Sequence, residues 1–356
     1  MLSKKARELL LKRLQDFIKE KSKVLILFHS DADGLCSALL TFHVLKKFCK
    51  KIIAEPLTQE KRGLNFKKIK KFKAERIIIL DWNIDQSAKD VKELEKEYKI
   101  LIIDHHKIYA DLNSENTIFI KSQYFSTLDG SKYPTSKLCY DLFSNFVDIE
   151  KYSWLALVGL KGDNAISHWK NFVESVMKKF KISKKWLEEF EELISSVEAY
   201  NKKLMKKLFE VLKKEERPQK NLKKIKFYKL KEKMEKEIKK FIKEFPKRAE
   251  IYEKLDLIFY KIKSKFYIKS IISNKLSKKF PNKTIILILD NGKKELFISA
   301  RRQDYKVAVN DLLELATKDL KNANAGGHIP AAGGKILRKD LKKFKQNIIR
   351  ILEEGK

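Results

Sequence analysis

Short apolar runs alternate with segments of helical spacing along the first 170 residues. Three of these runs are uninterrupted, at residues 24–28, 77–80 and 100–103. Apolar runs without polar alternation are typical of strands that are buried on both faces. Helical spacing is found at residues 35–48, 87–98, 136–146 and 152–160. This alternation predicts an α/β fold, in which right-handed crossovers join the strands of a mostly parallel sheet.

The rest of the chain predicts a helical connector followed by a smaller α+β domain. Residues 171–250 show no strand pattern, and their last 50 residues hold 20 Lys or Arg against 8 Glu. Strand runs return at residues 257–262, 284–289 and 295–299, and helical spacing at 307–320 and 341–352. Asn291-Gly292 predicts a tight hairpin turn, and residues 325–334 are expected to form a glycine-rich loop. We therefore expect three parts, at residues 1–170, 171–250 and 251–356.

Composition narrows the class of protein. A chain of 356 residues with 43% hydrophobic content can form two domains with substantial cores. The cysteines at positions 36, 49 and 139 are scattered and predict neither a disulfide framework nor a zinc-thiolate site. No apolar run reaches the roughly 18 residues of a membrane span, so we expect a cytoplasmic protein without a membrane partner.

The net charge of +33 favours polyanionic partners, above all nucleic acid. A lysine bias of the whole genome would produce the same excess of basic residues. Charge by itself therefore does not decide between these two explanations.

Ionisable residues directly follow the apolar runs and one helical segment. They form four groups, His29-Ser-Asp-Ala-Asp-Gly34, Asp81, Asp104-His-His106 and Asp163. Because ligands of open α/β sheets bind beyond the carboxyl ends of the strands, we expect these groups to converge. Carboxylates in such proximity repel one another unless cations compensate them, and oxygen ligands mixed with imidazole suit Mn²⁺ or Mg²⁺.

Each group also has a simpler explanation. Asp-Ala-Asp-Gly is frequent as a turn that caps a helix, and paired histidines after a strand can be caps or can orient other ligands. The combination is more specific than its parts, because four of the six histidines, at positions 29, 105, 106 and 328, fall within three short motifs.

The four groups resemble, in order and approximate spacing, the motifs of DHH phosphoesterases. Gly326-Gly-His-Ile-Pro-Ala-Ala-Gly333 resembles the glycine-rich motif of the DHH-associated C-terminal domain. The form Asp-Ala-Asp-Gly and its distance from His29 resemble the RecJ branch, especially archaeal RecJ-like nucleases. The resemblance covers both ends of the chain and leaves the lysine-rich middle unmatched.

This resemblance implies a role for each residue of the motifs. Asp31, Asp81 and Asp163, with His29 as an additional candidate, would hold one Mn²⁺ or Mg²⁺. Asp33, Asp81 and His105 would hold a second ion, and water between the ions would attack phosphorus in line. His106 would contact phosphoryl oxygens, and Asp104 would orient a histidine or complete the metal shell. The substrate contacts implied in the second domain are Arg301, Arg302, Gly326, Gly327 and His328, although the glycines are also compatible with a tight packing turn.

The function that the resemblance implies is exonucleolytic hydrolysis of single-stranded DNA or RNA. Replication or repair proteins are the protein partners to expect. Two alternatives stay open: a phosphodiesterase or phosphatase for short oligonucleotides, cyclic dinucleotides or pAp, and a non-catalytic replisome scaffold. The sequence does not distinguish DNA from RNA or one direction of digestion from the other.

Overall fold

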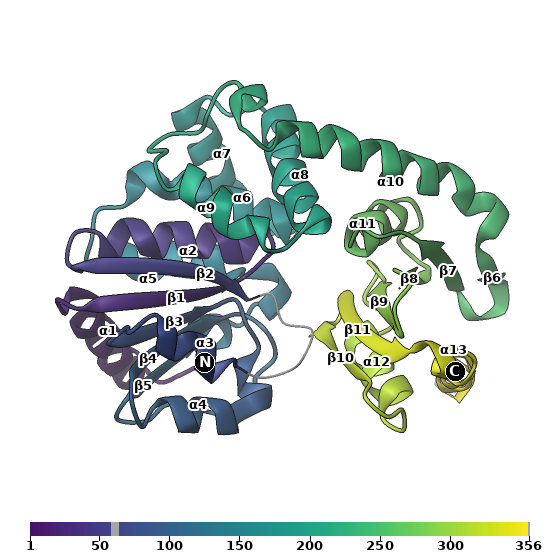
Figure 1. Cartoon of the computed structure of the whole chain (residues 1–356), viewed down its shortest axis with the longest axis horizontal. Helices are drawn as coiled ribbons and strands as arrows, with labels where there is room; N and C mark the ends of the chain where they lie inside the picture. The colour runs from purple at the N-terminus through teal and green to yellow at the C-terminus, as the bar shows by residue number, and fades with distance from the viewer. Residues whose placement is uncertain (58–63, 355–356) are drawn as a thin grey trace. The chain divides into compact units, whose positions relative to one another are not determined.

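Two β-sheets organise the chain, one in each of two units (Figure 1). The computed structural model describes residues 1–57 and 64–354. Unit 1 comprises Met1–Glu198 and Lys202–Tyr228, and unit 2 comprises Ala199–Asn201 and Lys229–Lys356. Each unit has its own hydrophobic core, so each is described by itself.

The sheet of unit 1 is parallel throughout, with the strand order β2-β1-β3-β4-β5. Its strands are β1 (Lys23–His29), β2 (Lys51–Leu57), β3 (Arg76–Leu80), β4 (Lys99–Asp104) and β5 (Thr117–Lys121). The three central strands coincide with the three apolar runs, because side chains on both of their faces are buried. The α/β prediction for this part of the chain is confirmed.

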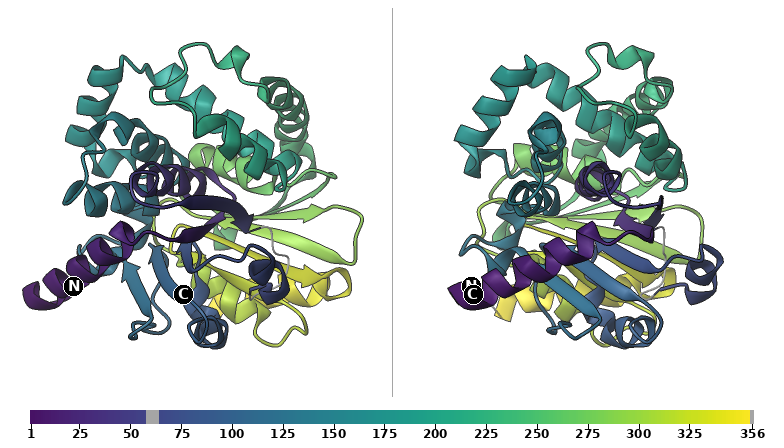
Figure 2. Two further views of the ribbon diagram at one scale, coloured as in Figure 1. Left: turned by 60° about the vertical axis from the view of Figure 1, so that its left-hand side comes forward. Right: turned by 90° about the vertical axis from the view of Figure 1, so that its left-hand side faces the viewer.

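The two edge strands, β2 and β5, were missed by the sequence analysis. β2 contains Glu55 and Pro56, which are unfavourable in central strands but compatible with an edge. β5 has only five residues and is surrounded by polar sequence, so its apolar pattern is too short to be distinctive. The strand is nevertheless buried, because α1 (Lys4–Lys19) lies beside it (Figure 2). The guanidinium of Arg13 in α1 donates to the Thr117 carbonyl at 3.2 Å.

Helices cover both faces of this sheet. The others in unit 1 are α2 (Ala32–Leu45), α3 (Phe66–Lys71), α4 (Ala88–Leu94), α5 (Thr135–Ser144), α6 (Ser153–Gly162), α7 (Lys170–Phe180), α8 (Lys184–Tyr200, whose end enters unit 2) and α9 (Leu204–Leu212). Leu25 and Leu27 of β1 pack in one cluster with Ile69 of α3 and Val91 of α4. α2, α5 and α6 pack together on the opposite face, so their ends meet the carboxyl edge of the sheet.

Unit 2 contains a mixed six-stranded sheet with the order β10-β11-β9-β8-β7-β6. Its elements are α10 (Tyr228–Arg248), β6 (Glu250–Tyr252), β7 (Leu257–Lys263), α11 (Lys269–Lys279), β8 (Thr284–Asp290), β9 (Glu295–Arg301), α12 (Val309–Thr317), β10 (Asn324–His328), β11 (Ala331–Leu337) and α13 (Leu341–Glu354). Only β7 and β8 pair in parallel, and the other pairs are antiparallel. Met234 of α10 and Ile272 of α11 pack on one face of the sheet, whereas Leu313 of α12 and Phe344 of α13 pack on the other.

The glycine-rich segment 325–334 is not a loop, as the sequence analysis expected, but most of a β-hairpin. Gly326 pairs with Gly333 and Gly327 with Ala332, so backbone hydrogen bonds between β10 and β11 define the structure. Glycines carry no side-chain pattern, which is why the strands were missed. The hairpin predicted at Asn291-Gly292 is confirmed between β8 and β9, with a φ of 84° at Gly292. Its connection is longer than the tight turn expected, because residues 291–295 lie between the paired residues Asp290 and Leu296.

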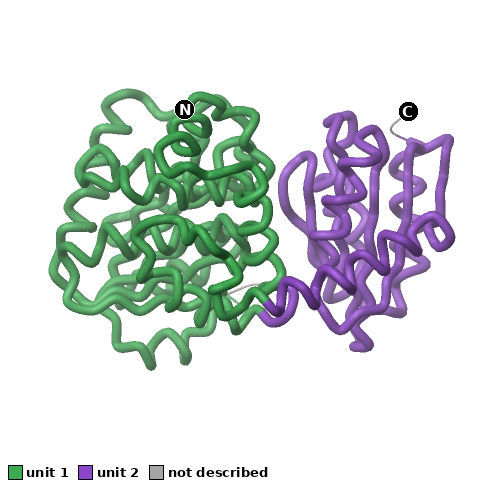
Figure 3. Tube along the Cα trace, turned by 90° about the horizontal axis from the view of Figure 1, so that it is seen from above, with its two compact units in different colours: residues 1–198, 202–228 green, residues 199–201, 229–356 purple. Residues whose placement is uncertain are grey.

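The lysine-rich middle of the chain is helical, as predicted, but it is shared between the units. α7, α9 and most of α8 lie in unit 1, and α10 lies in unit 2 except for its first residue (Figure 3). The division at residues 170 and 250 stays a prediction. Within the described residues, no helix is both long and apolar enough to cross a membrane.

Candidate metal centre

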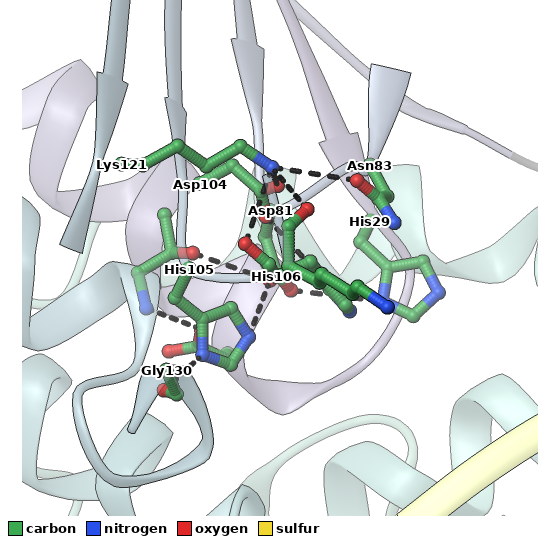
Figure 4. A network of polar contacts seen from close by, with 12 residues as sticks. His29, Asp81, Asn83, Asp104, His105, His106, Lys121 and Gly130 are labelled. Carbon is green, nitrogen blue, oxygen red and sulfur yellow. Dashed lines mark hydrogen bonds and ion pairs between the residues drawn. The ribbon is translucent and has the colours of Figure 1, made fainter. Parts of the chain in front are cut away.

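Ionisable side chains gather where the central strands of unit 1 end (Figure 4). His29 is the last residue of β1, Asp81 follows β3, and Asp104 ends β4. Parallel neighbours end at the same edge of the sheet, which brings these three positions together. The convergence expected from the sequence is therefore present in the fold.

Asp81 lies at the middle of this group and has a left-handed backbone conformation, with φ at 57°. Its Oδ1 lies 3.2 Å from Nε2 of His105, and its Oδ2 lies 3.6 Å from Nδ1 of His29. Burial alone would raise the pKa of Asp81, but the two imidazoles lower it well below its usual value. Positive φ at a residue other than glycine is uncommon and clusters at functional sites.

His105 is buried, and its hydrogen bonds define its tautomer. Nδ1 lies 2.9 Å from the Gly130 carbonyl, which can only accept, so Nδ1 carries the proton. Nε2 faces Asp81 and also lies 3.4 Å from Oδ2 of Asp163. Burial would lower the pKa of His105, but the surrounding carboxylates raise it well above its usual value. Because Nδ1 is engaged by Gly130, Nε2 is the ring atom that faces the carboxylates, and it would bind a cation in place of its proton.

Asp33 is held in the first turn of α2 by the start of α5. Its two carboxylate oxygens accept hydrogen bonds from the backbone N–H groups of Thr135 and Ser136, at 2.7 and 2.9 Å. Burial and the charge of Asp81 raise the pKa of Asp33 to about 7. Gly159 makes room for this contact, since a Cβ there would lie 2.7 Å from Asp33 and 2.0 Å from the Ser136 hydroxyl.

His29 and Asp31 are the more open members, with 28% and 35% of their side chains exposed. Asp31 caps α2 by accepting a 2.9 Å hydrogen bond from the Gly34 N–H at Oδ1. Its other oxygen lies 2.8 Å from Nδ1 of His29. Burial would lower the pKa of His29, but Asp31 and Asp81 raise it well above its usual value. Asp31 thus has the helix-capping role considered above and still presents a carboxylate oxygen to His29.

Three overlapping sets of ligand atoms in unit 1 could hold a cation, with all atoms of a set within 4.8 Å of one another. His29, Asp31 and Asp81 form the first set, and Asp33, His105 and Asp163 form the second. The third set contains Asp81, Asp104, His105 and His106. The resemblance assigns Asp163 to the ion held by Asp31, whereas the structure groups it with Asp33. Burial and the charge of Asp33 raise the pKa of Asp163 well above its usual value. Carboxylate oxygens with one imidazole in each of the first two sets fit Mn²⁺ or Mg²⁺.

Asp104 has a different environment from the other acids. It is fully buried, and Oδ1 lies 2.8 Å from Nδ1 of His106, whereas Oδ2 lies 2.6 Å from Nζ of Lys121. Burial would raise the pKa of Asp104, but Lys121 and His106 lower it well below its usual value. Since both oxygens have partners, Asp104 is better placed to orient His106 than to hold an ion.

The residues predicted as substrate contacts lie in unit 2. Strand registers align His328, Ala331 and Arg301 in one row across β10, β11 and β9. Gly327 has a φ of 144°, and a Cβ there would lie 2.5 Å from the Ala331 carbonyl, so the hairpin requires glycine at this position. Arg302 is buried, and its guanidinium binds Asp304 and Thr284. These internal bonds engage the guanidinium of Arg302 and so do not favour its contact with a substrate. That contact stays a prediction.

Family models match both units. The N-terminal domain of the DHH family matches residues 23–160, and the DHHA1 domain matches residues 265–354. The chain belongs to the DHH family. Its assignment to the archaeal RecJ-like branch stays a prediction. No curated protein matches the chain in sequence.

Solved structures with this DHH fold cover nearly the whole chain. A DHH domain protein described as a member of a family of ribosomal proteins is 14% identical, with a TM-score of 0.73 over 98% of this chain and 91% of that one. RecJ from Thermus thermophilus in complex with Mn²⁺ is 11% identical, with a TM-score of 0.62 over 97% of this chain and 54% of that one. An exopolyphosphatase-related protein from Bacteroides fragilis is 16% identical, with a TM-score of 0.56 over 97% of each chain. At these identities the matches establish a shared fold.

Lys121 is the main residue of the DHH site that the sequence analysis missed. Besides Asp104 it contacts Asp85 at 3.2 Å and the carbonyls of His106 and Lys107 at 3.3 Å. The parallel register places Lys121 directly beside Asp104. A lysine that ends a short apolar run, Thr-Ile-Phe-Ile-Lys, was the available signal, but it has meaning only once β5 is recognised as a strand.

Proposed function

We propose that this DHH family protein is a metal-dependent phosphodiesterase that releases nucleotides from an end of single-stranded DNA or RNA. The observation that carries the proposal is the position of Asp81, whose Oδ2 faces His29 of the first ligand set and whose Oδ1 faces His105 of the second. A carboxylate that bridges two ions is the arrangement used for phosphate ester cleavage. The fold shared with manganese-bound RecJ supports the same chemistry.

Each of the first two ligand sets would hold one cation. His29, Asp31 and Asp81 would hold one Mn²⁺ or Mg²⁺, and Asp33, His105 and Asp163 the other, with Asp81 shared. Such ions supply charge neutralisation of the phosphoryl group and lower the pKa of water towards neutrality. The carboxylates of both sets would keep these ions on the carboxyl edge of a rigid sheet.

His106 would act on the substrate and not on the ions. Asp104 keeps the Nδ1 proton of His106 in place and would stabilise an imidazolium whose Nε2–H donates to a phosphoryl oxygen. In unit 2, Arg301 and His328, with the backbone N–H groups of Gly326 and Gly327, would bind a backbone phosphate. These contacts would hold the strand while the terminal phosphodiester is hydrolysed.

Digestion of end-labelled strands tests this function. Purified protein with Mn²⁺ should convert single-stranded DNA or RNA, labelled at the 5′ or the 3′ end, to mononucleotides, and the ladder of products gives the direction. The variant Asp81→Asn should lower the rate by at least about 100-fold and weaken Mn²⁺ binding in calorimetry. Asparagine also tolerates a left-handed backbone, so this change removes the charge and preserves the conformation.

Asp16→Asn provides a matched control. Asp16 is an exposed carboxylate on α1 of the same unit, so its substitution should leave both rate and Mn²⁺ binding unchanged. Release of no nucleotide by a wild-type protein that binds Mn²⁺ would refute the exonuclease proposal. Equal activities of Asp81→Asn and wild type would refute the proposed role of the metal centre.

A further inference from the structure

Six lysines occupy one exposed face of α10 in unit 2. They are Lys229, Lys233, Lys236, Lys240, Lys243 and Lys247. Their spacing of four, three, four, three and four residues returns to the same side of a helix at every turn. Met234, Ile238 and Phe241 lie on the other side and are buried in the core of unit 2. We call these six residues the lysine stripe.

The lysine stripe is narrow and long. At 100° per residue its members fall within a sector of about 80°, and at 1.5 Å per residue they extend over about 27 Å. The four glutamates of α10, at positions 232, 235, 237 and 244, lie outside this sector. The result is a continuous line of positive charge without an intervening acid.

The stripe repeats like charges along one side of the helix. Each of its lysines has another lysine of the stripe three or four residues away, and such pairs are unfavourable. Glutamates lie at the same spacing from five of the six lysines, but they are on the flanks of the stripe. Of the three other basic residues of α10, Lys231 pairs with Glu235 and Arg248 pairs with Glu244, whereas Lys239 has no ion pair among the described residues. Within the residues that the structure describes, no lysine of the stripe has an ion-pair partner. The ammonium groups of the stripe are therefore not engaged by the acids of the described chain and can bind an external polyanion.

We propose that the lysine stripe binds the sugar-phosphate backbone of single-stranded nucleic acid. This proposal rests on the proposed function and specifies where a long substrate is held. A line of lysine charges on one helix matches a linear polyanion, whose binding releases counterions. An anionic membrane is a poorer match, because α10 has none of the exposed large apolar residues that an interfacial helix inserts into lipid.

Salt-dependent binding of a fluorescein-labelled 20-residue oligo-dT, measured by anisotropy without divalent ions, tests the proposal. The test variant is Lys229→Gln/Lys236→Gln/Lys243→Gln, and the matched control is Lys5→Gln/Lys12→Gln/Lys19→Gln on α1. Both triplets are exposed, have seven-residue spacing and remove three charges. Glutamine retains the helix propensity of lysine, so both variants should fold.

The test variant should reduce the slope of log affinity against log salt by about 2, since each phosphate contact on a single strand contributes about 0.7. The control should keep the wild-type slope. Equal slopes for the test variant and wild type would overturn the proposal, as would a loss of slope of the same size in the control. A stripe that binds inorganic polyphosphate but not oligo-dT in parallel titrations would also overturn it.

This binding assay tests the lysine stripe independently of the proposed hydrolysis. Because no divalent ion is present, the slopes report the surface even if the wild-type protein cleaves no strand. With Mn²⁺ added, the test variant should digest a long strand more slowly than wild type but hydrolyse a dinucleotide at the wild-type rate. A variant that loses both activities equally would contradict a role in holding long strands.

Discussion

The metal centre of unit 1 and the lysine stripe of unit 2 both concentrate charges of one sign, but in opposite environments. In the metal centre the carboxylates are mostly buried, and each has an N–H group, an imidazole or Lys121 within contact distance. In the stripe the lysines are exposed, and two of them, Lys233 and Lys240, also have their ammonium groups over aromatic rings. Charge in the first region is therefore coupled to folding, whereas charge in the second can change with little effect on stability.

Removing the buried ammonium group of Lys121 should have the largest effect on stability. Lys121→Met leaves Asp104 and Asp85 buried without their ammonium partner, so we expect unfolding to become easier by about 3–5 kcal/mol at neutral pH. Urea denaturation followed by circular dichroism measures this difference. Lys96→Met is the control, because Lys96 pairs with Glu93 on the surface and should cost less than about 1 kcal/mol. Similar stabilities of the two variants would remove the contrast between buried and exposed charge.

His43 is a second buried ionisable residue, and its contribution to stability depends on pH. It stacks on Tyr152 with ring centroids 3.7 Å apart, and burial, with the nearby Lys46 and Lys151 opposed by Glu216, lowers its pKa to about 3. The unfolded chain takes up this proton near pH 6.5, so stability should fall as pH decreases from 6.5 towards 3. From pH 7 to pH 4 the loss is about 3 kcal/mol.

His43→Phe should remove this component of the pH dependence. The measurement is the difference in unfolding free energy between pH 7 and pH 4, which cancels any packing change common to both conditions. His168→Gln, at an exposed histidine, should retain the wild-type dependence. An unchanged difference in His43→Phe would show that His43 does not remain neutral in the folded protein.

Gly159 allows the metal centre to be perturbed without removing a charge. In Gly159→Ala the new methyl group displaces Ser136 and Asp33, and Mn²⁺ affinity in calorimetry should fall by about 10- to 100-fold. Gly333→Ala in unit 2 is the control, because the nearest atom to a Cβ there is 3.7 Å away. Wild-type affinity in Gly159→Ala would mean that Asp33 does not need its present position.

The smallest effect is expected for an ion pair at the rim of unit 2. Arg338 binds both oxygens of Asp290 and lowers the pKa of that carboxyl to about 2. The pair stabilises the fold above the ordinary pKa of an aspartate, and this contribution is lost as pH falls towards 2. Arg338→Gln should return the pKa of Asp290 towards its usual value in a carboxyl NMR titration. It should lower stability at pH 7 by about 1 kcal/mol, because the 42% exposure of Arg338 screens the pair. A pKa that remains near 2 would assign the shift to other neighbours.

The central strands of unit 1 were predicted correctly, whereas the edge strands and the glycine-rich hairpin were missed. The apolar runs at 24–28, 77–80 and 100–103 required burial on both faces, so strands were the only interpretation that fits their length. β2 and β5 are edges, where Pro56 and short length weaken the pattern. The hairpin of β10 and β11 depends on backbone pairing between glycines, and side-chain patterns do not report such pairing.

The same limit explains what was missed in the candidate site. Asp31, Asp33, Asp81, His105 and Asp163 were all predicted to converge because each follows an element that ends at one sheet edge. The position of Asp163 beside Asp33 depends on how α6 packs against α2, which no local pattern encodes. Lys121 was missed for a related reason, since its partner Asp104 is 17 residues away and becomes a neighbour only through strand pairing.

The pair of Asp104 and Lys121 also constrains how the sheet assembles. A slip of β5 by one residue would turn every side chain of the strand to the opposite face and bury the ammonium group of Lys121 away from its acid. The ion pair therefore selects one alignment of an otherwise short edge strand. A misregistered β5 would therefore leave Asp104, the residue that orients His106, buried without its ammonium partner.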